Sequence, residues 1–68
     1  MRFLEILEIR GDKLSPRLIN LEYVDLIYPD TNINKYCYFR IHKIEMPLQV
    51  QGSYEDWRVA LNSRGLVF

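Results

Sequence analysis

Residues 35–44 have the sequence Lys-Tyr-Cys-Tyr-Phe-Arg-Ile-His-Lys-Ile, and this alternation predicts a β-strand with two unlike faces. Successive side chains of a strand point to opposite sides of the sheet. One side would carry Cys37, Phe39 and Ile41, an apolar row suited to a core. The other would carry large amphipathic groups of the kind enriched at protein interfaces, namely Tyr36, Tyr38, Arg40 and His42. We predict that this second row binds a partner.

The length and composition predict one small domain that spans residues 1–68. A chain of about 60 residues buries only roughly 60% of the surface that it exposes when unfolded, and such domains often gain stability from disulfides, metals or self-association. Cys37 is the only cysteine and His42 the only histidine, which excludes an intramolecular disulfide and a four-ligand zinc site within one chain. Because hydrophobic residues make up 49% of the chain, we expect a homo-oligomer without metal or cofactor.

The charges favour a protein partner over nucleic acid. Nine Lys and Arg residues balance nine Asp and Glu residues, whereas proteins that bind phosphate backbones usually carry a basic excess or patch. Residues 1–10 are too short and too acidic for a signal peptide. No stretch approaches the roughly 20 apolar residues of a membrane span. We expect a cytoplasmic protein that does not contact the membrane.

The first half of the chain predicts short strands separated by turns. Residues 3–10 are rich in apolar and β-branched side chains and stop at a Gly-Asp turn, which predicts a strand buried on both faces. Pro16 excludes the interior of a central strand. We expect strands at residues 17–19 and 23–28, separated by a single turn that Asn20 begins. Apolar residues of this segment also repeat at helical spacing. A helix is therefore an alternative prediction for this segment.

A hairpin and a further strand are predicted after that segment. Residues 29–32, Pro-Asp-Thr-Asn, form a turn signature, so the strands at 23–28 and 35–44 should pair. Residues 48–51 alternate apolar and polar side chains after a bend at Met46-Pro47. This pattern predicts an edge-like strand with Leu48 and Val50 pointing inward.

The last part of the chain predicts one helix. Ser53 is a good N-cap, and Gly65 is placed to end the helix. An apolar stripe along the helix would cover one face of the sheet, and it consists of Tyr54, Trp57, Ala60 and Leu61. The predicted fold class is α+β, a small and strongly bent antiparallel sheet of four to five strands with one C-terminal helix. The apolar tail is predicted to be a second partner-binding surface, made of Leu66, Val67 and Phe68.

Two segments resemble a known family. The first segment is residues 18–27, Leu-Ile-Asn-Leu-Glu-Tyr-Val-Asp-Leu-Ile, and the second is residues 50–57, Val-Gln-Gly-Ser-Tyr-Glu-Asp-Trp. Together with the predicted ββββα order of elements, they resemble small bacterial and phage domains of the FlbD/SwrD type. Those domains have an Asn near the end of one strand, an apolar-x-x-Ile step, and a strand that runs into Ser-x-x-Glu and a helix. Relatives tend to have an acidic residue where this chain has Gly52. The resemblance implies a small non-catalytic accessory protein.

No pair of residues in the sequence predicts catalysis. Cys37 and His42 could form a nucleophile with its base, but their odd spacing puts them on opposite faces of one strand. Cys37 therefore fits a small core residue better. The carboxylates do not pair in the way that general acid–base chemistry requires. We predict a protein that is not an enzyme and has no catalytic residue.

The predicted function is non-catalytic protein binding with self-association. A compact chain of this type also fits a phage-type inhibitor that covers a site on a host protein. The alternative is a single-stranded nucleic-acid-binding module that uses the aromatic and basic strand face, with Lys35 and Lys43 beside it. A third interpretation is that the helix packs on the tyrosine row and buries it.

Overall fold

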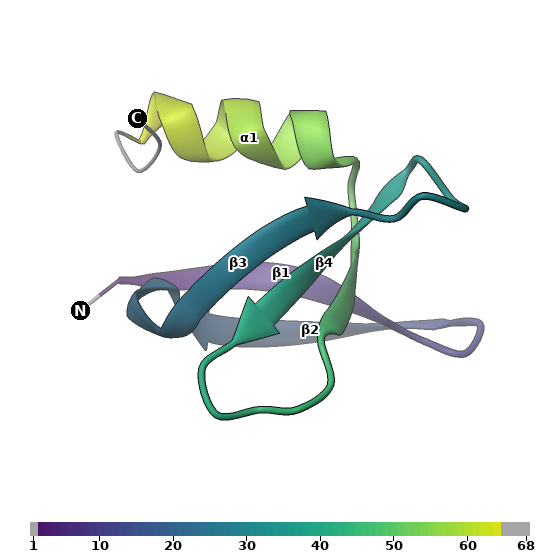
Figure 1. Ribbon diagram of the computed structural model, residues 1–68, viewed down its shortest axis with the longest axis horizontal. Helices are drawn as coiled ribbons and strands as arrows, with labels where there is room; N and C mark the ends of the chain where they lie inside the picture. The colour runs from purple at the N-terminus through teal and green to yellow at the C-terminus, as the bar shows by residue number, and fades with distance from the viewer. Residues whose placement is uncertain (1, 65–68) are drawn as a thin grey trace.

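The computed structural model describes residues 2–64 and contains five strands, one 3₁₀ helix and one α-helix (Figure 1). In chain order these are β1 (Phe3–Arg10), β2 (Lys13–Asn20), η1 (Leu21–Tyr23), β3 (Val24–Pro29), β4 (Tyr36–Ile41), β5 (Leu48–Gln51) and α1 (Tyr54–Ser63). The strands form one antiparallel sheet in the order β2-β1-β5-β4-β3. The predicted α+β class, a five-stranded antiparallel sheet with a C-terminal helix, is confirmed.

β5 lies in the centre of the sheet, between β1 and β4. Its predicted edge-like position is therefore wrong. Alternation of apolar and polar side chains marks any antiparallel strand with one buried face, whether the strand is central or at an edge. The predicted orientation is correct, because Val50 is fully buried and Leu48 packs against the core.

β1 and β2 form a hairpin around the two-residue turn Gly11-Asp12, and Arg10 pairs with Lys13 across it. Gly11 has a φ of 65°, and a glycine with positive φ in the first central position is typical of a type II′ hairpin turn. β2 begins before the predicted strand at 17–19 and contains Pro16. An edge strand accommodates this proline because its outward N–H needs no partner in the sheet.

β1 is buried on one face, so the prediction of burial on both faces is wrong. Leu4 and Ile6 are buried in the core, whereas Phe3 and Leu7 on the other face are exposed. Both faces of a strand are buried only where other elements pack on both faces of the sheet. The described residues 2–64 contain one α-helix, and that helix packs on the side of Phe39.

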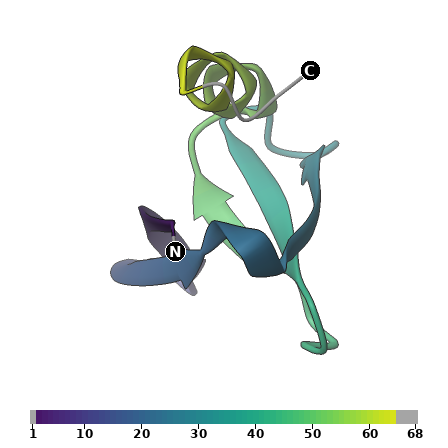
Figure 2. The ribbon, with the colours of Figure 1, turned by 90° about the vertical axis from the view of Figure 1, so that its left-hand side faces the viewer.

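The two outermost strands, β2 and β3, follow each other in the chain and are joined by η1. The predicted single turn begun by Asn20 is confirmed, since the Asn20 side chain accepts a hydrogen bond of 3.0 Å from the N–H of Glu22. Both edges of the sheet meet at this turn, so the sheet is strongly bent. Figure 2 shows the β1–β2 hairpin set at a steep angle to the strands that rise toward α1.

β4 is shorter than the predicted strand at 35–44, although its pairing with β3 is confirmed. The strand ends at Ile41 because the chain turns at His42 and Lys43, where Lys43 has a φ of 66°. The turn between β3 and β4 is organised by the buried Asp30. Its Oδ1 atom accepts hydrogen bonds from the N–H groups of Asn32 and Ile33, at 2.9 and 3.1 Å.

The core lies between the inner face of the bent sheet and α1. It consists of the buried apolar residues Leu4, Ile6, Ile19, Cys37, Phe39, Val50 and Leu61. Trp57 of α1 meets Phe39 edge to face, with ring centroids 5.4 Å apart. Tyr54 and Ala60 are exposed, so the predicted apolar stripe is narrower than expected, and Trp57 and Leu61 make the contact with the core.

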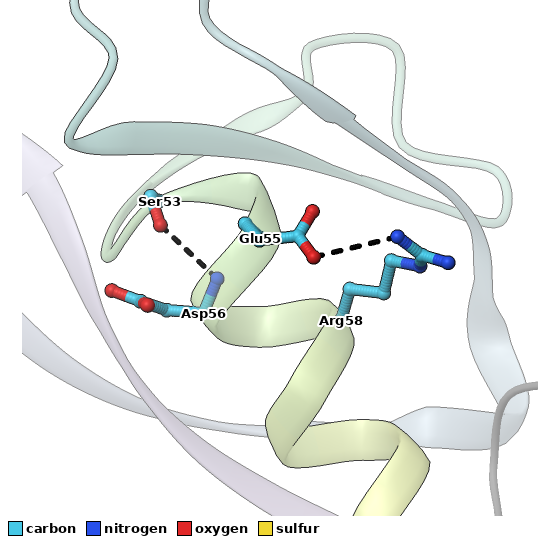
Figure 3. Close-up of polar contacts among 4 residues, drawn as sticks. All are labelled: Ser53, Glu55, Asp56 and Arg58. Atoms are coloured by element: carbon cyan, nitrogen blue, oxygen red, sulfur yellow. Dashed lines mark hydrogen bonds and ion pairs between the residues drawn. The ribbon is translucent and has the colours of Figure 1, made fainter.

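The start of α1 is fixed by Ser53 and Gly52. Ser53 is the N-cap as predicted, and its Oγ atom accepts a hydrogen bond of 3.1 Å from the N–H of Asp56 (Figure 3). Glu55 and Arg58 form an exposed ion pair of 3.4 Å on the same turn. Gly52 has a φ of 110°, which lets the chain leave β5 and bring Trp57 back to donate a hydrogen bond to the Gln51 carbonyl at 3.0 Å. The predicted end of the helix at Gly65 lies outside the described residues.

Candidate protein-interaction surface

The outer face of the sheet carries the tyrosine row of β4. Because Phe39 packs on Trp57 of α1, its strand neighbours Tyr38 and Arg40 point to the opposite side. The interpretation in which the helix covers the tyrosine row is therefore wrong. The strand register adds two residues of β3 to this side, since Tyr28 lies opposite Tyr38 and Leu26 lies opposite Arg40. We call this surface the tyrosine zone, and it consists of Leu26, Tyr28, Tyr36, Tyr38 and Arg40.

The tyrosine zone combines fixed aromatic rings with exposed groups. Tyr28 and Tyr38 are stacked, with ring centroids 5.3 Å apart and an interplanar angle of 26°. The Lys35 ammonium lies 5.7 Å from the centroid of the Tyr36 ring. Leu26 is 53% exposed, and Arg40 is exposed without an ion pair to another residue of the described range 2–64. Tyrosine and arginine are among the residues enriched at protein interfaces.

Asp30 lies beside the tyrosine zone and connects it to β5. Its Oδ2 atom accepts a hydrogen bond of 3.0 Å from the side-chain amide of Gln49, the residue that pairs with Tyr38 on β5. The pKa of Asp30 is lowered, mainly by the N–H of Asn32 and further by Ile33, Gln49 and Tyr38, against a smaller opposing effect of burial. Burial raises the pKa of Tyr38, and the negative charge of Asp30 raises it further. The Asp30 carboxylate therefore lies close enough to Tyr38 to influence the pKa of its hydroxyl group.

His42 lies in the turn that follows β4, apart from the strand that holds Tyr36, Tyr38 and Arg40. Its Nδ1 atom is 3.3 Å from Oδ2 of Asp25, and both side chains are about half exposed. Asp25 sits at the irregularity in the β3–β4 register. His42 thus belongs to the margin of the predicted site. The predicted tail residues Leu66, Val67 and Phe68 lie outside the described residues.

A second apolar surface lies on the outer side of the β1–β2 hairpin. Pairs across the hairpin place Leu7 opposite Pro16 and Ile9 opposite Leu14. Leu18 is 69% exposed and Phe3 is 53% exposed on the same side. We call this surface the hairpin zone, and it consists of Phe3, Leu7, Ile9, Leu14, Pro16 and Leu18. Sequence reasoning missed it because residues 3–10 were interpreted as a doubly buried strand, although Leu14, Pro16 and Leu18 already alternate.

The inner sides of β1 and β2 and the ends of β4 and β5 line a cleft of about 440 Å³. Ile19, Ile41 and Leu48 give it an apolar lining that joins the core. Arg17 closes one side by pairing its Nε atom with Oε1 of Glu8 at 3.0 Å. The cleft lies toward the β4–β5 loop, which Figure 1 shows on the side of the molecule away from α1. It has room for an apolar side chain of a binding partner.

The groups that sequence analysis considered for catalysis are not brought together. Cys37 is fully buried, and burial raises the pKa of its thiol to about 11, so the reactive thiolate is suppressed at neutral pH. His42 is exposed in its turn. Within residues 2–64 there is no group of three or more His, Cys, Asp and Glu side chains that could hold a metal ion. In the same part of the chain, no helix is long and apolar enough to cross a membrane.

Comparison of the chain with protein-family models, curated proteins and solved structures found no match. The resemblance to FlbD/SwrD-type domains therefore stays a prediction.

Proposed function

We propose that this protein is a non-catalytic binding protein that recognises other protein surfaces and associates with itself. The main support is the outer face of the sheet, which α1 leaves uncovered and which carries both the tyrosine zone and the hairpin zone. Monomeric proteins rarely expose contiguous apolar patches larger than a few hundred Å². Two exposed zones with apolar side chains on so small a molecule favour a bound partner.

The size of the molecule makes association energetically important. Its accessible surface is 5273 Å², and a standard interface covers about 800 Å² per partner. One interface would thus cover about 15% of this surface. A domain of this length has a small core, so burial at an interface would add substantially to its stability.

Light scattering over a range of concentrations tests this proposal. The average mass of the wild-type protein should rise with concentration. Leu26→Lys and Leu18→Lys, one in each zone, should each weaken association at least tenfold. Val59→Lys is the matched control, because Val59 is 61% exposed on α1 and lies outside both zones. Equal behaviour of all three variants and the wild type would contradict the proposal, and thermal melts would confirm that each variant is folded.

The double change Tyr38→Ala with Arg40→Ala tests the strand face predicted first. It should weaken association while the sheet remains folded, because neither side chain belongs to the core. Unchanged mass by light scattering would remove the strand face from the interface. A protein that stays monomeric at every concentration would instead favour the inhibitor form of the proposal, in which the tyrosine zone covers a site on a different protein.

Single-stranded nucleic acid is the second candidate partner. The support is the Lys35 ammonium over the Tyr36 ring, with Arg40 on the same side of β4, since aromatic rings beside cations can hold bases and phosphates. Against it, Tyr28 already occupies one face of the Tyr38 ring. Fluorescence anisotropy of a labelled oligothymidylate should show binding at low salt that disappears as salt rises. No binding at low salt would eliminate this candidate.

A further inference from the structure

The hairpin zone and the tyrosine zone carry opposite charges. Glu5, opposite Leu18, lies on the outer side of the hairpin, and Asp12 is exposed in the turn at the end of the hairpin. The tyrosine zone has Arg40 within it and Lys35 beside Tyr36. None of these four side chains forms an ion pair with another residue between positions 2 and 64. Near the tyrosine zone, Asp30 is buried and hydrogen-bonded, and Asp25 is paired with His42. The exposed unpaired charge is therefore acidic at the hairpin zone and basic at the tyrosine zone.

The spacing of the charges also matches. A strand rises about 3.3 Å per residue, so the five positions from Lys35 to Arg40 span roughly 16 Å. The seven positions from Glu5 to Asp12 include the turn and span roughly 20 Å. Two acidic groups on one zone can thus lie over two basic groups on the other, because long Lys and Arg side chains absorb the remaining difference.

The β2 edge of the sheet is poorly suited to strand addition. Arg10 and Lys13 flank the two-residue turn and form a hydrogen-bonded pair, so by alternation Leu7 and Pro16 form a non-hydrogen-bonded pair. A residue in a non-hydrogen-bonded pair directs its N–H outward, away from the neighbouring strand. Pro16 has no N–H to offer there, because proline lacks this group. An added strand would lose a hydrogen bond in the middle of β2. At the hairpin, a partner is therefore expected on the face of the sheet and not at the β2 edge.

The bend of the sheet separates the two zones. The core fills the inside of the bend, so the outer face is convex, and β5 with Gln49 and Gln51 lies between the zones. Figure 2 shows the two parts of the sheet pointing in different directions. One flat partner surface cannot contact both zones at once. Each zone therefore needs a partner surface of its own.

We propose that the hairpin zone of one copy packs on the tyrosine zone of a second copy, with Glu5 directed toward Arg40. This inference rests on the self-association proposed above. Such a contact joins two different surfaces, so it builds a ring if the rotation closes and an open chain if it does not. The apolar side chains provide the buried area, and the charges set the orientation of the two copies.

A charge exchange tests this pairing directly. Glu5→Arg and Arg40→Glu should each raise the concentration needed for association at least tenfold, because each places like charges together. The double variant carrying both changes, and an equimolar mixture of the two single variants, should both recover association. Glu45→Arg is the matched control, because Glu45 is exposed in the β4–β5 loop and belongs to neither zone. This control should associate like the wild type.

The outcomes separate this pairing from the proposed function. If the wild-type protein associates but neither the double variant nor the mixture recovers, the pairing of Glu5 with Arg40 is wrong and self-association stands. If the wild-type protein is monomeric at every concentration, both self-association and the pairing are wrong. Recovery in the double variant and in the mixture, with unchanged thermal melts, supports the pairing.

Discussion

A single buried carboxylate, that of Asp30, links the β3–β4 turn to β5. It accepts hydrogen bonds from two backbone N–H groups and from Gln49. These bonds favour the ionised form, and the pKa of Asp30 is accordingly lowered from 3.8. A group with a lowered folded-state pKa contributes stability above its unfolded pKa and loses it as the pH falls through the folded value. The ionised form of Asp30 thus strengthens the link between the β3–β4 turn and β5.

We expect the stability of the protein to decrease as the pH falls below about 4, and Asp30→Asn to reduce this dependence. The amide can still accept from the N–H groups of Asn32 and Ile33, but its NH₂ group cannot accept from Gln49. Urea unfolding at pH 7 and pH 3 measures the effect. Glu45→Gln is the control, and a pH dependence in Asp30→Asn as steep as in the wild type would contradict the prediction.

Cys37 is expected to be inert in the folded protein. The thiol is fully buried and its pKa is raised to about 11, while only the thiolate reacts with alkylating agents. Iodoacetamide at pH 7.5 should leave the native protein unmodified and should label it rapidly in guanidinium chloride. Mass spectrometry detects the adduct, and fast labelling of the native protein would show that Cys37 is accessible.

At the scale of the elements, the junction between β5 and α1 depends on Gly52. A Cβ atom at this position would lie 2.7 Å from Nε1 of Trp57, and its φ of 110° is rarely adopted by L residues. Gly11 provides a matched control, since its φ is 65° but a Cβ there meets nothing within 4 Å. The two glycines separate backbone strain from a steric clash.

Gly11→Ala should lower the free energy of unfolding by about 1 kcal/mol, which is typical for an L residue in a left-handed conformation. Gly52→Ala should lower the free energy of unfolding by about 2–4 kcal/mol. In addition to the backbone strain, this change displaces Trp57 and breaks its hydrogen bond to Gln51. Urea unfolding followed by Trp57 fluorescence measures both. Equal costs for the two variants would show that the contact with Trp57 is easily relieved.

The elements themselves were largely predictable from local signals. Asn20, Gly11 and Ser53 each fix a turn or a helix start through their own backbone preferences and hydrogen bonds. The position of β5 was not predictable in this way, because the strand order depends on which distant segments pair. Glu8 meets Val50 across 42 positions of sequence, and no short pattern encodes that contact.

The candidate site was half predictable. The alternation of β4 correctly placed Tyr36, Tyr38 and Arg40 opposite the core. The hairpin zone was missed, because an apolar strand such as β1 has the same composition whether both faces are buried or one remains open. That difference is decided by how many covering elements the whole chain supplies.

At the scale of the whole molecule, Pro16 protects the open edge of β2. Pro16→Val would place an outward N–H in the middle of an exposed apolar strand, which is a template for pairing with other chains. We expect faster formation of thioflavin-positive aggregates than in the wild type. Ser15→Val is the control, because the N–H of Ser15 points toward Glu8 on β1. Equal rates for both variants would attribute aggregation to hydrophobicity alone.

The central place of β5 also has a consequence for biosynthesis. The hairpins β1–β2 and β3–β4 are each local, but they share a sheet only through β5, which comes after both in the chain. We therefore expect a nascent chain on the ribosome to lack the strand that joins its two hairpins until residue 51 has emerged. The molecule should be indivisible, so that a premature stop before that residue leaves no smaller folded unit.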